Sequence, residues 1–396
     1  MNCVKIDKNR ITKGIEKPRI AVGLPTYNEA EYVGHVTAQI DKGLLRYPDE
    51  DPVIVNLDSR SKDGTCKKFM ETRTIAHKRC MEVPRGKGSG LVRFFEFCLE
   101  NEIPRAVTVD ADLLNIKDFW IQRLADPLSR GHDFVIPIYA RHKYDANITN
   151  HFSYPLILAV FGVELRQPLA GEFGYSRDFY KYLLSLPRYY HKARQYGIDT
   201  LITHAAVTGG FRIKEVYLDK KIHSSAHPHR EALFRQVFET AIATSKPFFE
   251  KEFPSPEISR SGTHSGTYDN HDFFYRPILP RLIRNAQMRF EKYYLGGAYN
   301  TFFGNDPVVR KIKAAFDGGD MMAVDAELWT NYLAAALKKC YRDEFDTRNL
   351  MFLSRITWPV FSWRFMSHWL TVEHLSVKKT ETLIKEQAAL LRDKMS

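Results

Sequence analysis

Short apolar runs that alternate with longer helical stretches are the feature that most constrains the fold of this chain. One run covers residues 19–25 and a second covers 52–57, and helical stretches follow them at 31–42 and 66–76. Further strand-like runs lie at 105–109 and 132–137. Strands and helices alternating in this order predict an α/β fold with a mostly parallel, doubly wound sheet.

The pattern changes near residue 225, where strand signals give way to long amphipathic stretches. These stretches are rich in Phe, Leu and Lys, and they lie at 231–243, 278–294, 322–341 and 375–395. Between them, residues 253–273 carry Pro, Ser, Gly, His and Asp, which favours an extended connection. We therefore expect an α/β domain at 1–228 and a helical domain without strands at 229–396.

Composition and charge exclude several classes of protein. Hydrophobic residues make up 44% of the chain and aromatic residues 13%, which is typical of a globular protein and not of a disordered one. The net charge is +11, but Lys and Arg are interspersed with acidic residues, so we expect no nucleic-acid partner. Small anionic substrates remain compatible with this charge.

The cysteines and the apolar segments bear on the compartment. The chain has five cysteines, with no C-x-x-C pair, so neither a disulfide framework nor a zinc knuckle is expected. A reducing, cytoplasmic compartment fits this pattern best. Residues 1–17 lack the apolar core of a signal peptide. The longest apolar stretch, 155–163, has about half the length that a membrane span requires.

Polar residues follow three of the apolar runs, and in a doubly wound sheet the ligand lies at these carboxyl ends. Asp110 and Asp112 could hold a hard divalent cation together with diphosphate oxygens, or they could form a turn or a helix cap. Asp58 could accept hydrogen bonds from a base or a ribose, or it could stabilise a polar turn. Both interpretations of each site stay open at this point.

Glycine and histidine patterns add further candidates. Lys87 lies between Gly86 and Gly88, which suits a diphosphate but equally a solvated turn. Gly171 would let the backbone approach a ligand closely, because glycine has no side chain. His223 follows a strand-like stretch at 212–218, with His227 and His229 beyond it. A histidine beside carboxylates favours Mn²⁺ over Mg²⁺, although single histidines are more often structural.

Taken together, these motifs resemble those of nucleotide-sugar-dependent glycosyltransferases with the GT-A fold. The matching segments, in order, are PTYNE at 25–29, LDSRSKDGT at 57–65, GKG at 86–88 and DAD at 110–112. More narrowly, QPLAGE at 167–172 is similar to the Q-P-L-G-G-E segment of the retaining mannosylglycerate and glucosyl-3-phosphoglycerate synthases. YGIDT at 196–200, KIH at 221–223 and YAR at 139–141 with DANIT at 145–149 match the same group.

The resemblance implies a metal-dependent hexosyltransferase that uses Mn²⁺ or Mg²⁺ and retains the anomeric configuration. Its donor would be GDP-mannose or UDP-glucose, and its acceptor a small anion such as D-glycerate. It implies the following roles: Asp112, His223 and Asp110 at the metal; Pro25, Tyr27, Glu29, Asp58, Lys87, Asp110 and Ala111 at the nucleotide; Leu169, Gly171 and Glu172 at the donor sugar; Arg141 and Thr149 at the acceptor carboxylate; Asp199, Asp112 and Leu169 at the reacting centre.

The sequence departs from the family pattern at three points. Ala170 replaces the first glycine of Q-P-L-G-G-E, Arg60 replaces a usual glycine, and Ser224-Ser225-Ala226 separates His223 from His227, which makes His227 an alternative metal ligand. Asp199 could be a nucleophile, a base or an orienting group. By analogy with the family we expect a homodimer. An inverting transferase acting on a lipid phosphate or a polysaccharide, and a non-catalytic nucleotide-sugar-binding protein, are the alternatives.

Overall fold

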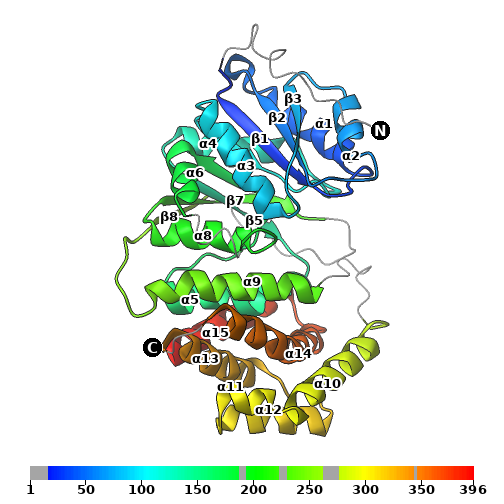
Figure 1. The fold of residues 1–396 in the computed structure, drawn as a ribbon, viewed down its shortest axis with the longest axis vertical. Helices are drawn as coiled ribbons and strands as arrows, with labels where there is room; N and C mark the ends of the chain where they lie inside the picture. The colour runs from blue at the N-terminus through cyan, green and yellow to red at the C-terminus, as the bar shows by residue number, and fades with distance from the viewer. Residues whose placement is uncertain (1–16, 187–192, 223–229, 262–275, 343–345) are drawn as a thin grey trace.

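The structure is a computed structural model, and it describes residues 17–186, 193–222, 230–261, 276–342 and 346–396. An α/β layer occupies one end of the molecule and a bundle of helices the other, with α5 and α9 between them (Figure 1). The expected α/β architecture, with a mostly parallel sheet and a helical C-terminal part, is confirmed.

One eight-stranded sheet forms the α/β layer, in the order β3-β2-β1-β4-β6-β5-β7-β8. Only β6 runs antiparallel to its neighbours, β4 and β5, among the described strands. The bounds are β1 Ile20–Thr26, β2 Val53–Asp58, β3 His77–Glu82, β4 Arg105–Thr108, β5 Phe134–Ala140, β6 Phe173–Ser176, β7 Arg212–Lys220 and β8 Glu257–Ser261. The central strands β1, β2, β4 and β5 are almost wholly buried, which explains their continuous apolar runs.

Six helices accompany this sheet: α1 Val33–Leu44, α2 Thr65–Glu71, α3 Lys87–Glu100, α4 Phe119–Ser129, α6 Arg177–Leu184 and α8 Ile198–Thr208. Their apolar faces join the strands in one core, for example through Phe94 and Leu124. The helix predicted at 66–76 is too long, because α2 ends at Glu71. The chain then continues into β3, a strand that the sequence analysis did not predict.

A second core lies among the C-terminal helices, which are α9 Arg230–Ser245, α10 Leu279–Leu295, α11 Ala298–Phe303, α12 Pro307–Gly318, α13 Ala326–Arg342, α14 Thr347–Val372 and α15 Val377–Met395. The four predicted amphipathic stretches correspond to α9, α10, α13 and α15. No described helix has both the length and the apolar character needed to cross a membrane.

Residues from before position 229 also enter the second core. Phe152, in a π-helical turn at Thr149–Ser153 (η2), and Leu156, in α5 (Tyr154–Phe161), pack among the C-terminal helices. Two indole N–H groups tie this segment down: Trp329 donates to the carbonyl of His151 at 2.7 Å, and Trp369 to that of Tyr144 at 3.0 Å. The segment after β5 is therefore held by the helical bundle.

Two expectations are corrected here. First, β8 is a strand beyond residue 229: it pairs in parallel with β7 at the edge of the sheet, within the stretch expected to be an extended connection. Its alternation is weak, because it is short and half-exposed. Second, Cys66 and Cys80 form a disulfide that joins α2 to β3. The sequence does not reveal this pair, because its two cysteines lie 14 residues apart in different elements. The cysteine pattern therefore no longer argues for a reducing compartment.

Candidate active site

The loops that follow β1 and β2 are joined by side-chain hydrogen bonds at the carboxyl edge of the sheet. The backbone N–H of Asn28 donates to Ser61 Oγ at 2.8 Å, and that of Lys62 donates to Asn28 Oδ1 at 2.9 Å. The Ala30 N–H reaches Asp63 Oδ2 at 3.0 Å. The polar residues after Pro25 and Leu57 thus form one rigid surface, as the strand order predicted.

Arg60, which replaces the family's usual glycine, has a backbone conformation that is unfavourable for a residue with a side chain. Its φ angle is 62°, in the left-handed region that glycine enters freely and other residues enter at a cost. The guanidinium of Arg60 pairs with Glu82 Oε1 at 3.1 Å. The substitution therefore keeps the backbone shape that the loop after β2 requires.

Most of the residues predicted to hold the nucleoside lie on this surface. Pro25 is half-buried within β1, and Asp58 is buried and accepts the backbone N–H of Ser61 at 3.1 Å. Tyr27 exposes its ring, over which the guanidinium of Arg85 lies 4.6 Å from the centroid. Burial together with the charges of Asp112, Asp110 and Asp63 raises the pKa of Glu29 to about 7. Negative potential therefore gathers around Glu29.

Lys87 connects this surface to the centre of the site. It begins α3, and its ammonium lies 2.9 Å from Asp110 Oδ1 and 3.0 Å from Asp199 Oδ2. Burial alone would lower the pKa of Lys87, but Asp110 and Asp199 raise it well above its usual value, so the side chain stays charged. The backbone N–H groups of Gly88 and Ser89 are already bonded to carbonyls of Gln195 and Arg194.

Lys221 forms a second cationic bridge beside the first. Its ammonium contacts both carboxylate oxygens of Glu172, at 2.8 and 2.7 Å, Asp110 Oδ2 at 3.2 Å and the carbonyl of Ala170 at 2.8 Å. With Lys87, it completes an alternating row of charges, in the order Glu172, Lys221, Asp110, Lys87 and Asp199. We call these five side chains the charge row.

The carboxylates of the charge row differ in their protonation behaviour. Burial raises the pKa of Glu172 to about 7 although Lys221 opposes the effect, and burial also raises the pKa of Asp199. Burial acts in the same direction on Asp110, but Lys87 and Lys221 outweigh it and lower its pKa below the usual range. Asp199 Oδ1 is buried and has no hydrogen-bond partner among the described residues. That oxygen is therefore a buried, unsatisfied hydrogen-bond acceptor next to Lys87.

The close packing of Asp110 and Lys221 against the predicted donor-sugar segment requires glycine at position 171. Its φ is +94°, and a Cβ atom there would lie 2.3 Å from Asp110 Oδ2 and 2.9 Å from Lys221 Nζ. The neighbouring Ala170 is buried, whereas Leu169 is half-buried and packs against the second core. Ala170, which stands where the family has its first glycine, thus buries its methyl group in this segment.

The segment 167–172 is fixed from both sides. Gln167 accepts the backbone N–H of Tyr139 through Oε1 at 3.2 Å and donates through Nε2 to the carbonyl of Tyr139 at 2.8 Å. Thr203 Oγ1, from α8, donates to the carbonyl of Pro168 at 2.8 Å. The predicted donor-sugar segment is therefore held against the end of β5.

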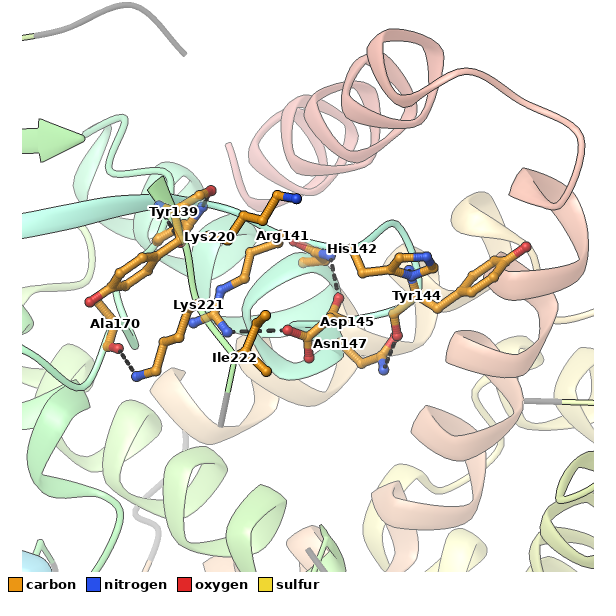
Figure 2. Close-up of polar contacts among 12 residues, drawn as sticks. Tyr139, Arg141, His142, Tyr144, Asp145, Asn147, Ala170, Lys220, Lys221 and Ile222 are labelled. Carbon is orange, nitrogen blue, oxygen red and sulfur yellow. Dashed lines mark hydrogen bonds and ion pairs between the residues drawn. The ribbon is translucent and has the colours of Figure 1, made fainter. Parts of the chain in front are cut away.

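The predicted acceptor residues follow β5 directly. Arg141 Nη1 lies 3.1 Å from Asp145 Oδ2, and its Nε is buried without a hydrogen-bond partner among the described residues. Figure 2 shows Arg141 extending between Tyr139, Lys221 and Asp145. Thr149 is buried at the start of η2. This segment is the one that Trp329 and Trp369 hold, so the helical bundle shapes the predicted acceptor side.

The structure places the predicted metal ligands only in part. Asp112 follows Asp110 and the buried Ala111 at the end of β4. The N–H of Leu114 donates to the carbonyl of Ile222 at 2.9 Å, so the described chain reaches Ile222 beside Asp112. His223 and its alternative His227 lie outside the described residues. Within the described part of the chain, no group of three or more metal-ligating side chains is present.

The donor set nevertheless suits a hard divalent cation. Asp110 and Asp112 are both carboxylates, and both oxygens of Asp110 contact lysines in this structure. The raised pKa of Glu29, caused in part by Asp112 and Asp110, shows that negative charge is concentrated on this side. A cation there would relieve that repulsion.

Three residues that contact the site were not among the predicted site residues. Lys221 was visible in the sequence only as part of the KIH motif, and Arg85 only as part of the turn before Lys87. Tyr139 lies in the YAR motif, but nothing in its sequence context indicates that its hydroxyl reaches Glu172. Their contacts join residues that are 33 to 111 positions apart in the sequence, so local sequence does not reveal them. Only their place in or beside a recognised motif could have pointed to these three residues.

Comparisons with known proteins bear on this arrangement. The family model described as mannosylglycerate synthase, GT domain, matches residues 58–241. No curated protein matches the chain significantly. Two of the solved structures that match are of glucosyl-3-phosphoglycerate synthase from Mycobacterium tuberculosis. One contains Mn²⁺, UDP and phosphoglyceric acid; it is 23% identical, with a TM-score of 0.45, over 58% of this chain and 78% of that one.

The other contains Mn²⁺, UDP and glucosyl-3-phosphoglycerate; it is 22% identical, with a TM-score of 0.45, over 61% of this chain and 88% of that one. The matched family segment begins at Asp58 and includes Lys87, the DAD motif, QPLAGE and Asp199. The resemblance read from the motifs is thus confirmed: over residues 58–241 this chain is similar to the glycosyltransferase domain of the mannosylglycerate synthases.

Proposed function

We propose that this protein is a retaining glycosyltransferase that moves mannose or glucose from a nucleotide diphosphate sugar to a small carboxylate acceptor such as D-glycerate. The charge row is the observation that carries the proposal. It joins two buried ammonium groups to three carboxylates that come from separate segments of the chain. A glycosyl donor and an anionic acceptor need adjacent binding sites, because the acceptor hydroxyl must reach the anomeric carbon of the donor.

The chain's own residues supply most of what the reaction needs. As the bond from the anomeric carbon to the phosphate breaks, negative charge grows on the leaving diphosphate, and the ammonium of Lys87 stabilises it. Asp110 and Asp199 hold Lys87 in place before the donor arrives. Because this cation is already fixed, little reorganisation is required in the transition state.

The sugar lies against the segment 169–172 in this proposal. Glu172 lines the sugar, and the absence of a side chain at Gly171 lets Asp110 and Lys221 lie close to the backbone of this segment. Asp199 Oδ1, which has no partner among the described residues, accepts a hydroxyl of the sugar. We assign Asp199 an orienting role, because its other oxygen is bonded to Lys87.

A divalent cation, Mn²⁺ or Mg²⁺, adds Lewis-acid stabilisation of the diphosphate when it is bound. Asp112 is the described residue that would hold it, with Asp110 supporting and His223 or His227 as the proposed nitrogen ligand. The solved M. tuberculosis synthase was crystallised with Mn²⁺ and UDP, which supports the same ion class here.

Arg141 holds the acceptor carboxylate, since a guanidinium can bind it through two parallel hydrogen bonds. Its fixed position brings an acceptor hydroxyl to the anomeric carbon, which is the contribution of proximity to the rate. Phosphoglyceric acid, which is present in the solved synthase complex, is a second acceptor to test. By analogy with the family, we also propose a homodimer.

The proposal is tested by measuring nucleoside diphosphate release with GDP-mannose or UDP-glucose, each crossed with D-glycerate and 3-phosphoglycerate, in Mn²⁺ or Mg²⁺. We expect release that depends on one donor, one acceptor and the metal, and an α-linked product by NMR. A β-linked product would refute retention. Binding of a nucleotide sugar without acceptor-dependent release from any pair would refute the small carboxylate acceptor.

A further inference from the structure

Tyr139 connects the two halves of the site through its hydroxyl and its ring. It lies near the end of β5 with its side chain fully buried, and its hydroxyl donates to Glu172 Oε2. Burial, reinforced by Glu172, raises the pKa of Tyr139 well above its usual value. The phenol is therefore protonated at neutral pH and can donate a hydrogen bond.

The ring of Tyr139 is close to the cations of both halves. The guanidinium carbon of Arg141 lies 5.2 Å from the ring centroid, and Lys221 Nζ lies 5.5 Å from it (Figure 2). Both distances are within the range of a cation–π interaction, which is stronger where the groups are desolvated. The side chain of Arg141 is only 15% exposed and that of Lys221 only 6%.

The backbone of Tyr139 is held as firmly as its side chain. Gln167 bonds to both its N–H and its carbonyl, so the ring cannot move independently of the donor-sugar segment. Glu172 is held by Lys221 as well as by Tyr139, whereas Arg141 has Asp145 as its ion-pair partner. The ring of Tyr139 is thus the element that Arg141 and Glu172 share.

We propose that Tyr139 is a positioning residue that orients Glu172 toward the donor sugar through its hydroxyl and Arg141 toward the acceptor carboxylate through its ring. The inference rests on the proposed function of Glu172 and Arg141. It differs from a purely structural role because the two effects are chemically separable: one requires the oxygen, and the other requires only the aromatic ring.

Two substitutions separate these effects. Tyr139→Phe keeps the ring under Arg141 but removes the hydrogen bond to Glu172, so we expect donor affinity or turnover to fall by about tenfold while the acceptor KM stays within about twofold. Tyr139→Leu removes the hydroxyl and the aromatic ring, so in addition to the effect on the donor we expect the acceptor KM to rise by about tenfold. Tyr180→Phe is the matched control: it is another buried tyrosine of the same core, whose hydroxyl donates to the carbonyl of Ile103 at 2.6 Å.

The experiment combines steady-state kinetics for both substrates with calorimetric titrations of UDP-glucose, GDP-mannose, the free nucleoside diphosphates and D-glycerate. Tyr139→Phe should weaken the nucleotide sugar and leave the free nucleoside diphosphate unaffected, because Glu172 faces the sugar. Thermal unfolding of all three variants shows how much each substitution changes stability.

The outcomes distinguish the positioning role from the proposed function. Wild-type protein without turnover on any pair would overturn the function, and the titrations would still test Tyr139. Tyr139→Phe that matches wild type in both kinetics and sugar binding would overturn the positioning role. The same holds if Tyr139→Phe changes donor and acceptor constants equally, or if Tyr180→Phe produces the same kinetic split.

Discussion

Replacing Gly171 with alanine would test whether the charge row must stand where the structure places it. The added Cβ would lie 2.3 Å from Asp110 Oδ2, where an ordinary contact between such atoms is about 3.4 Å, so the carboxylate or the backbone has to shift by about 1 Å. A displacement of that size at a reacting centre costs about 100-fold in rate. We therefore expect kcat/KM for the donor to fall by about two orders of magnitude.

The same substitution also strains the backbone, and that contribution can be measured separately. Gly171 has φ +94°, and an L-residue in this region costs about 1 kcal/mol in stability. Gly162→Ala is the matched control, because Gly162 has φ +67° but no atom within 4 Å of the added methyl group. It should lose comparable stability and keep the wild-type rate.

The assay is initial-rate nucleoside diphosphate release, with thermal unfolding of both variants measured beside it. If Gly171→Ala retained the wild-type rate, Asp110 would not need the position that the structure gives it. If Gly162→Ala lost as much activity as Gly171→Ala, strain and not the contact with Asp110 would be the cause.

The remaining predictions concern the metal, the acceptor and acid stability. Asp112→Ala should lower turnover by about 1,000-fold or more, because a cation at the diphosphate contributes several kcal/mol, and its thermal unfolding should match wild type; unchanged turnover would contradict the metal assignment. Arg141→Ala should raise the acceptor KM by about 10- to 100-fold and leave the donor KM nearly constant, and equal effects on both would contradict its role. Burial lowers the pKa of His204 to about 3, and those of His151 and His368 well below the usual value. Above the unfolded-state pKa of about 6.5, these histidines are neutral in both states and cost the fold nothing. Below that pH the unfolded state takes up protons that the folded state cannot, so each histidine lowers the free energy of unfolding by about 1.4 kcal/mol per pH unit. The raised pKa values of Glu29 and Glu172 act in the opposite direction over the same range, so the test compares two proteins. Between pH 6.5 and pH 5, urea denaturation should show that wild type loses about 2 kcal/mol relative to His204→Gln in its free energy of unfolding; an identical slope in that variant would count against the explanation.

The parts of the fold that depend on local pattern could be predicted from the sequence. The buried strands β1, β2 and β4 are continuous apolar runs, and the polar residues after them share one edge because parallel strands all end there. β3 and β8 were missed for the opposite reason. Both lie on the edges of the sheet and are half-exposed, so they carry polar residues without a clear alternation.

The charge row could not be derived in the same way. Its partners come from five separate segments, and nothing in the sequence near Lys221 indicates that it bonds to Glu172 and Asp110. The motifs predicted Asp110, Lys87 and Glu172 individually, through resemblance, but their pairing with the lysines depends on the tertiary structure. The helix α14 was missed because it is apolar on most sides, which removes the periodicity that reveals an amphipathic helix.

The indole contacts of Trp329 and Trp369 have a consequence for how this protein could change its substrate. They anchor the segment after β5 to the helical bundle, whereas the loops after β1 and β2 are bonded to each other. The proposed acceptor segment therefore depends directly on the second core, whereas the loops proposed to hold the nucleoside do not. Substitutions in α13 or α14 are therefore expected to alter the proposed acceptor side while the loops after β1 and β2 keep their shape.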